Sequence, residues 1–147
     1  MLLTPLMATE KSLILFKPDA VEKNLVGPVL TRFQNEGFII RGIKMIQLDN
    51  DILDEHYDHV SDLSFFPVIK AFMSRSPVVV LILEGENVIA RVRELMGPTD
   101  SQKAKKGTIR GDYGESMMIN VCHASDSPEN ADIEINRFFK PEEVFSF

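Results

Sequence analysis

Tryptophan is absent from the 147-residue sequence, and cysteine occurs only once, as Cys122. A single cysteine excludes a disulfide within the chain and fits a reducing compartment. The neighbours of Cys122 are apolar, so we expect a buried side chain and not a reactive thiol. Histidines are also few. His56 and His59 lie three residues apart without a cysteine or third histidine in register, so we expect no structural zinc site.

Long hydrophobic runs are missing as well. The longest apolar run, Pro77 to Leu83, is far shorter than the ~20 residues that a membrane-spanning helix needs. No signal segment led by lysine or arginine precedes a cleavage-like site. We therefore expect a soluble, cytoplasmic protein.

Basic residues are outnumbered by acidic ones. Lysine and arginine total 16 against 22 aspartates and glutamates, which gives a formal charge of −6 and a pI near 5.1. This balance argues against a broad surface for nucleic acid or for an acidic membrane. Basic residues nevertheless gather between Arg91 and Gly111, where only Glu94 and Asp100 oppose them. Such a segment suits a small polyanion, and a solvated cationic loop is an equal alternative.

The length and the 44% hydrophobic content allow one well-filled core and are too small for two ordinary domains. We expect a tail over residues 1–9 and a single domain over residues 10–147. A modest number of strands, with helices on one face, predicts an α+β sandwich. The apolar patterns predict strands at Ser12 to Phe16, Phe38 to Leu48 and Pro77 to Glu84, and helices from Leu25 to a stop at Gly37, at Ile52 to Val60 with Asn50 or Asp51 as N-cap, at Phe65 to Met73, and at Val88 to Met96.

The last third of the chain begins with a long loop. Gly97 to Ser116 has little apolar pattern, and a long structureless loop in a compact domain usually carries function. Met117 to Cys122 then predicts a short strand. Ser127 and Pro128 are suited to the N-cap and first position of a following helix.

His123 lies between this strand and this helix, where the positive helix end favours an anion. An imidazole with an unperturbed pKa of roughly 6.5 is mostly neutral near pH 7, so one ring nitrogen keeps a lone pair for use as a base or nucleophile. A structural histidine at a strand end is the alternative. Strand alternation places Asn120 and His123 on opposite faces, so a shared site requires the chain to leave strand geometry just before His123.

Glycine-rich phosphate loops are absent, since neither G-x-x-x-x-G-K-[ST] nor G-x-G-x-x-G after a strand occurs. Phosphates would have to be bound by side chains instead. Lys17 at the end of the first strand, Arg93 on a helix, and Thr99 and Arg110 in the basic loop can converge near His123. Guanidinium groups match phosphate oxygens in a fork geometry.

In these motifs the chain resembles the nucleoside diphosphate kinases, from about Glu10 to its end. Any one tripeptide is weak, but the order and spacing of the motifs are highly specific, and the histidine signature alone is close to diagnostic. The matching stretches are Lys17-Pro18-Asp19, His56-Tyr57, Phe65-Phe66, Glu84-Gly85, Gly107 to Asp112 and Asn120-x-x-His123-Ala124-Ser125-Asp126-Ser127.

The resemblance implies a ferredoxin-like sandwich, with a four-stranded antiparallel sheet covered by helices, and a defined reaction. The γ-phosphoryl group of a nucleoside triphosphate would move by a ping-pong mechanism to His123 and then to any nucleoside diphosphate. Mg²⁺ would be held mainly by the nucleotide phosphates, with Asp126 as a possible ligand through water. Glu134 and Ser125 would orient the imidazole.

The resemblance also implies how the nucleotide is held. Lys17 and Asn120 would bind the ribose hydroxyls, and Tyr57 would lie near His123 and the phosphates. Phe65 would stack on the base, with Ile69 beside it, Met117 opposite and Phe66 in the core. Stacking does not distinguish bases, so broad base tolerance follows.

The chain departs from the family pattern at a few positions. Ala124 replaces a commoner glycine, which requires ordinary backbone angles there. The basic loop lacks two usual prolines, one after Thr99 and one at Lys106, which puts the stability of a homo-oligomer in doubt. A tetramer and a hexamer both remain open. A nucleotide-binding regulatory module without turnover is the alternative function, and a specific nucleic-acid or membrane partner is not expected.

Overall fold

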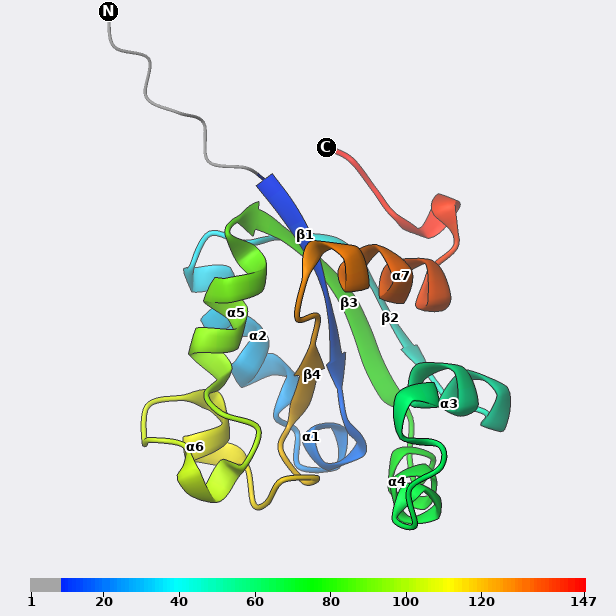
Figure 1. Ribbon diagram of the computed structural model, residues 1–147. Helices are drawn as coiled ribbons and strands as arrows, with labels where there is room; N and C mark the ends of the chain where they lie inside the picture. The colour runs from blue at the N-terminus through cyan, green and yellow to red at the C-terminus, as the bar shows by residue number, and fades with distance from the viewer. Residues whose placement is uncertain (1–8) are drawn as a thin grey trace, which may run out of the picture.

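The computed structural model describes residues 9–147 and contains one four-stranded sheet in the order β2-β3-β1-β4 (Figure 1). The strands are β1 (Thr9–Phe16), β2 (Ile39–Ile46), β3 (Val78–Glu86) and β4 (Cys122–Ala124). Every pair is antiparallel, with β1 and β3 at the centre and β2 and β4 at the edges. The predicted four-stranded antiparallel sheet of the α+β class is confirmed.

Helices pack on both faces of this sheet. Successive β1 side chains alternate, so that Ile14 and Phe16 enter a core with α1, α2, α5 and α6, while Leu13 and Leu15 enter a core with α3, α4 and the end of α7. The expectation of helices on one face is wrong because β1 is apolar on both sides. The helices are α1 (Pro18–Glu22), α2 (Val26–Asn35), α3 (Asn50–His56), α4 (Phe66–Met73), α5 (Val88–Met96), α6 (Ile109–Tyr113) and α7 (Pro128–Phe138).

Local chemistry explains where several of these helices begin and end. Gly37, with φ of +85°, follows α2, and Gly97, with φ of +83°, follows α5. Both adopt the left-handed region that glycine enters without steric cost. The Ser127 hydroxyl accepts from the Asn130 N–H at the start of α7, with Pro128 at the first position, as predicted. Lys17 is extended, with φ of −71° and ψ of 166°, as expected for a residue before proline.

Several sequence predictions are wrong in detail. Met117 to Cys122 does not form a strand, because the chain turns through bends until β4 begins at Cys122. The long loop contains α6 and a short 3₁₀ helix at Ser101–Lys103. The N-cap of α3 is Asp49, whose carboxylate accepts from Ile52 N–H at 2.9 Å. The sequence analysis also missed α1.

Residues 1–8 of the predicted tail lie outside the described residues, whereas Thr9, assigned to that tail, begins β1. Across residues 9–147, no helix combines the length and the apolar character required to span a bilayer.

Candidate active site

His123 lies on β4, opposite Leu15 of β1, with its side chain 29% exposed. Its Nε2 atom is 2.6 Å from Oε2 of Glu134 on α7. Ser125 donates its hydroxyl to the other carboxylate oxygen, also over 2.6 Å, and accepts from the Leu13 N–H. The predicted group of histidine, serine and glutamate therefore lies together, with the imidazole reaching solvent on one side.

These hydrogen bonds determine the tautomer of His123. Burial opposes ionisation of Glu134, but hydrogen bonds and charge from His123 and Ser125 lower its pKa below the ordinary value. An ionised carboxylate only accepts hydrogen bonds, so Nε2 of His123 carries the proton. Nδ1 of His123 consequently keeps its lone pair.

A second imidazole, His56 at the end of α3, packs edge-on against His123, with ring centroids 4.9 Å apart. Nη1 of Arg137 lies 2.8 Å from Nδ1 of His56 and donates to it. Burial lowers the pKa of His56 to about 3, and the neighbouring His123 acts in the same direction. His56 is thus a neutral, buried group that supports one side of the His123 ring.

One nitrogen or oxygen atom each of His56, His123 and Glu134 lies within 4.8 Å of the others, so the three side chains are close enough to share a metal ion. Nδ1 of His56 and both oxygens of Glu134 already make hydrogen bonds, whereas Nδ1 of His123 keeps its lone pair. Arg137 occupies Nδ1 of His56, and Glu134 is engaged by His123 and Ser125. The guanidinium also places a positive charge beside the cluster. This arrangement supports the imidazole orientation and does not fit a cation centre.

The backbone before His123 contains an unusual turn. Val121 has φ of +79°, a value that β-branched residues rarely adopt. Cys122 N–H donates to the Asn120 carbonyl oxygen at 3.0 Å, a bond between residues i and i+2 that defines a γ-turn. This is the departure from strand geometry that a site shared by Asn120 and His123 requires. Asn120 donates from Nδ2 to the Thr99 carbonyl oxygen, while its own buried Oδ1 has no partner within residues 9–147.

Arg110 of α6 is 8% exposed and binds the backbone on both sides of this turn. Nε donates to the Asn120 oxygen, Nη2 to the Cys122 oxygen and Nη1 to the Gly97 oxygen, over 3.1, 2.8 and 3.1 Å. Burial lowers the pKa of Arg110, but guanidinium stays charged at any ordinary pH. Two of its five N–H groups remain for other acceptors.

Arg110 also lines a polar cavity of about 490 Å³ with Arg93 and Thr99. Arg93 and Thr99 are exposed, and Arg93 reaches the Ala124 carbonyl oxygen at 3.5 Å. Three of the four residues predicted for phosphate binding are therefore brought together, and the fourth, Lys17, does not line this cavity. The three lie on the α5 and α6 side of β4, next to the strand that carries His123.

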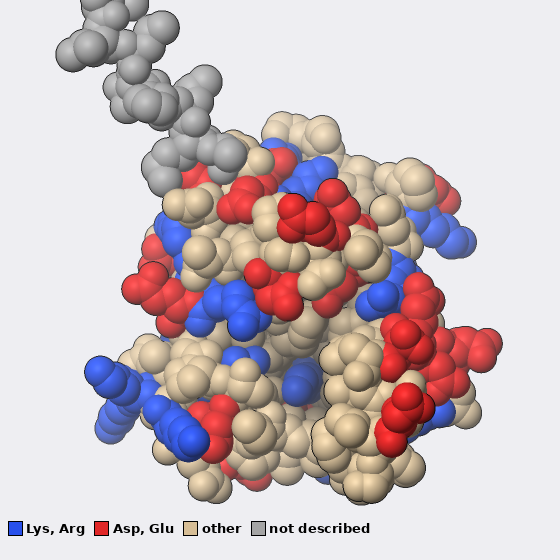
Figure 2. Space-filling model, viewed as in Figure 1, with Lys and Arg blue, Asp and Glu red and all other residues tan. Residues whose placement is uncertain are grey.

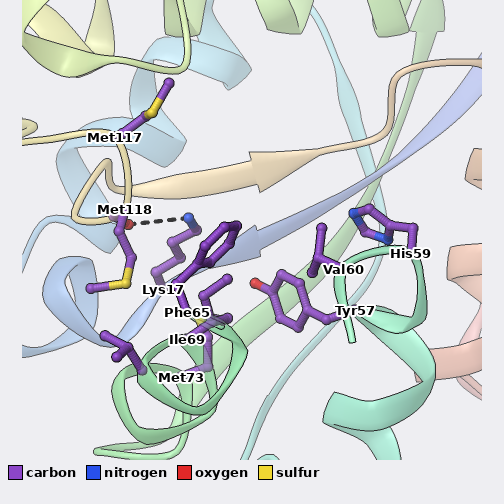
Figure 3. A pocket seen from close by; sticks show the side chains of 10 residues that line it. Lys17, Tyr57, His59, Val60, Phe65, Ile69, Met73, Met117 and Met118 are labelled. Atoms are coloured by element: carbon purple, nitrogen blue, oxygen red, sulfur yellow. Dashed lines mark hydrogen bonds between the residues drawn. The ribbon is translucent and has the colours of Figure 1, made fainter. Parts of the chain in front are cut away.

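A second cavity of about 490 Å³ is mainly apolar and is bounded by α4 and the segment before β4 (Figure 3). The molecular surface is hollowed between the α6 and α4 sides, with a basic group visible inside the hollow (Figure 2). In Figure 3, Met117 lies across Lys17 from Tyr57. The residues that line the cavity are Lys17, Tyr57, His59, Val60, Phe65, Val68, Ile69, Met73, Met117 and Met118.

This lining contains Lys17, Phe65, Ile69 and Met117 of the residues predicted for the nucleoside, but not Asn120. Phe65 and Met117 present 50% and 66% of their surface to solvent. The prediction that Phe66 packs in the core is wrong. Phe66 is half-buried and lies beneath the Lys70 ammonium, whereas Phe72 packs in the core. The sequence analysis missed His59, Val60, Val68, Met73 and Met118. Helical spacing from Phe65 places Val68 three positions on, a signal that could have identified it.

Lys17 lines the apolar cavity and lies close enough to Arg110 for their charges to interact. Its Nζ donates to the Met118 carbonyl oxygen at 3.2 Å and faces the apolar cavity (Figure 3). Burial lowers its pKa from 10.5 to about 8, and the charge of Arg110 acts in the same direction. Burial raises the pKa of Tyr57 to about 12, so Tyr57 remains a neutral phenol.

Asp126 lies three residues after His123 and is exposed. Its Oδ1 accepts from Nδ2 of Asn130 at 2.6 Å, and this bond lowers the pKa of the carboxyl below its ordinary value. Asp126 therefore offers an ionised carboxylate that is open to solvent just before the start of α7. That chemistry suits a hard divalent cation bound directly or through water.

Comparison with known proteins gives one consistent family. The sequence model described as nucleoside diphosphate kinase matches residues 10–144. A nucleoside diphosphate kinase from Parabacteroides distasonis is 47% identical over 138 residues, which cover 94% of this chain and 90% of the relative. One from Pyrococcus horikoshii is 43% identical over 142 residues, covering 95% and 90%.

Solved structures agree in fold. The nucleoside diphosphate kinase of Aquifex aeolicus superimposes with a TM-score of 0.89 and 44% identity, covering 94% of this chain and all of that one. A halophilic relative from Halobacterium salinarum, solved in complex with CDP, gives 0.91 at 35% identity, covering 95% and 93%.

Proposed function

Because these matches show that the chain belongs to the nucleoside diphosphate kinase family, we propose that His123 is its phosphoryl carrier and that Nδ1 is the atom that accepts the phosphoryl group. Phosphoryl transfer from a nucleoside triphosphate to a nucleoside diphosphate is the activity that goes with this membership. The observation that carries the proposal is the short contact between Glu134 and Nε2 of His123, which leaves only Nδ1 free.

The transfer needs no proton movement at the imidazole. The Nδ1 lone pair attacks the γ-phosphorus, an N–P bond forms, and the bond to the bridging oxygen breaks with its electrons leaving on the diphosphate. The ring becomes cationic, and the Glu134 carboxylate stabilises that charge through Nε2–H. In the second half, a terminal oxygen of another diphosphate attacks the phosphorus and the N–P bond breaks. Donor and acceptor therefore bind in turn.

Positively charged side chains neutralise the phosphates during this step, and hydroxyl groups donate hydrogen bonds to them. Arg93 and Thr99 are exposed in the polar cavity, and Arg110 has two N–H groups left after binding the backbone. Lys17 and the neutral phenol of Tyr57 approach from the apolar cavity. In-line positioning and charge neutralisation supply most of the catalysis in phosphoryl transfer.

Mg²⁺ is the divalent cation that we propose for this reaction. The cluster of His56, His123 and Glu134 does not suit it, because Mg²⁺ prefers oxygen ligands and near-octahedral geometry. Asp126 offers one exposed carboxylate, so the nucleotide phosphates and water would supply the remaining ligands. When bound, Mg²⁺ would neutralise charge on the phosphate oxygens.

The nucleoside would occupy the apolar cavity. Phe65 would stack on the base, with Ile69 beside it and Met117 opposite. The buried Oδ1 of Asn120 has no partner within the described residues, so it can accept a hydrogen bond from a ribose hydroxyl. The Lys17 ammonium can donate to a ribose oxygen in the same way. These contacts do not read base edges, which supports broad base tolerance.

We also propose a homo-oligomer, either a tetramer or a hexamer, in the cytoplasm. The edge strand β2 exposes Ile43 and Met45 by 48% and 61%, two residues apart on one side of the strand. Apolar side chains on an unpaired edge favour self-association. Cys122 is a free buried thiol, which fits a reducing compartment.

The test is the phosphoenzyme itself. Incubation with Mg²⁺ and radiolabelled ATP should give an acid-labile, alkali-stable label that GDP removes, and His123→Gln should abolish it while keeping the melting temperature. Phosphorus and nitrogen NMR of the labelled enzyme should assign the N–P bond to Nδ1. A label at Nε2 or on another residue would contradict the proposed carrier. A folded protein that binds nucleotide without any label would support the non-catalytic module.

A further inference from the structure

We propose that Asp19 is a positioning residue for phosphoryl transfer: its carboxylate holds the γ-turn at Val121 that directs His123 towards the nucleotide. Neither the sequence motifs nor the relatives' names assign a task to this side chain. The inference rests on His123 as phosphoryl carrier and goes further, because it concerns a residue that lines neither the polar nor the apolar cavity and is hydrogen-bonded to Val121, not to His123.

The turn at Val121 requires support from its surroundings. A γ-turn with positive φ is rare and strained, and a β-branched side chain makes it less favourable still. Glycine would relieve the strain, but the sequence has valine. Such a conformation persists only where the neighbouring structure over-determines it.

Each polar backbone group of Val121 is bound by one short segment. Val121 N–H donates to Oδ2 of Asp19 at 3.0 Å, and the Val121 carbonyl oxygen accepts from Lys17 N–H at 2.9 Å. Asp19 and Lys17 flank Pro18, whose fixed φ orients both groups towards the same residue. We call Lys17, Pro18 and Asp19 the clamp.

Asp19 is 1% exposed, and a carboxylate in that environment is unfavourable without compensation. Burial raises its pKa, opposed first by the hydrogen bond from Val121 and then by the charge of Lys17. Within residues 9–147, Oδ1 of Asp19 has no hydrogen-bond partner, and Oδ2 accepts from the Val121 N–H. The acceptor for Val121 is thus the contact that explains this buried group.

The clamp connects the two ends of the site. The Lys17 ammonium faces the apolar cavity, and the Lys17 backbone N–H donates to Val121. The same segment therefore positions both the Lys17 ammonium and His123. A shift of about 1 Å in His123 is enough to reduce a phosphoryl-transfer rate by as much as about a hundredfold. Loss of the acceptor at Asp19 should therefore lower the rate of transfer more than the affinity for nucleotide.

Two variants separate the acceptor from the charge. Asp19→Asn keeps a side-chain carbonyl that can accept from Val121, whereas Asp19→Leu has similar bulk and no acceptor. In single-turnover reactions with ATP, the maximal rate of phosphohistidine formation should fall about tenfold or more for Asp19→Leu and stay within about threefold for Asp19→Asn. The ADP dissociation constant should change little in either. Equal losses in both variants would overturn the proposal, because they would assign the effect to charge.

A double-mutant cycle tests the turn directly. Val121→Gly allows positive φ without steric cost, so the acceptor should matter less in that background. The loss of rate caused by Asp19→Leu should shrink from about tenfold in the wild-type background to about threefold or less in the Val121→Gly background. An unchanged loss would overturn the role in holding the turn.

Hydrogen exchange keeps the test open if Asp19→Leu does not fold. The Val121 amide of the wild-type protein should be strongly protected, and that protection should be largely retained in Asp19→Asn. Rapid exchange at Val121 in the wild type would overturn the clamp. A wild-type protein that fails to form any phosphohistidine would instead contradict His123 as carrier, so the two failures are distinguishable.

Discussion

Lys17 shows how a single residue is subject to opposing requirements. Its ammonium must be charged to bind an anionic ligand, yet burial and the nearby Arg110 disfavour that charge and lower the pKa to about 8. The ordinary value is 10.5, so the folded protein without ligand is destabilised by this charge at all pH values below about 8. The destabilisation is relieved between pH 8 and 10.5, where only the unfolded chain remains protonated.

The pH dependence of activity should reveal this lysine. We expect kcat/KM for nucleotide to decline as pH rises through about 8, because the free enzyme then loses the Lys17 charge. In Lys17→Arg the guanidinium stays protonated, so the alkaline decline should disappear even if the overall rate is lower. Steady-state rates from about pH 6 to about pH 10 at constant ionic strength provide the measurement. A decline at the same pH in both proteins would assign it to another group.

At the scale of elements, some helix ends were predictable, although the N-cap of α3 was not. Ser127, Pro128 and Gly37 have local chemistry that acts within one turn of their own position, and each occurs where expected. Lys17 could likewise be placed from Pro18 alone. The grouping of Arg93, Thr99 and Arg110 was expected from their places on a helix and in the basic loop, which do not fix their contacts.

The segment before β4 could not be predicted, and the reason is non-local. Its apolar run favours a strand, but Val121 is held in a γ-turn by Asp19, 102 positions earlier in the chain. Arg110 then uses two of its N–H groups on the carbonyls that flank the turn and a third on the Gly97 carbonyl, so it is partly a structural residue. No local pattern in the sequence reports these bonds, and valine gives no sign of positive φ.

The start of α3 offers a test of capping, because this helix carries His56 and leads into Tyr57. Asp49→Ala removes the acceptor for Ile52 N–H and should lower the free energy of unfolding by about 1 kcal/mol. Asp51→Ala is the matched control, since Asp51 lies in the first turn without capping and should cost about half as much or less. Urea unfolding measures both. A larger loss for Asp51→Ala would contradict the assigned cap.

At the scale of the whole molecule, the sheet is covered by helices on both faces but has an apolar edge at β2. Light scattering should give the mass of a tetramer or hexamer of the 16.6 kDa chain. The double variant Ile43→Lys, Met45→Lys should have a smaller assembly mass, because like charges buried at the interface oppose association. Ile133→Lys, at a residue 54% exposed on α7, is the matched control and should leave the mass unchanged. A smaller assembly in the control alone would place the interface elsewhere.

The apolar cavity beside Phe65 has a consequence for how the protein behaves in a mixture of nucleotides. If every base binds in this one cavity, donor triphosphates and acceptor diphosphates compete for the same site. The protein can then distinguish them only by their phosphates. Net flux then follows the relative abundance of each pair and reverses when the abundances do. An excess of diphosphates should also slow turnover. A diphosphate that binds while His123 carries no phosphoryl group blocks the cavity and cannot react.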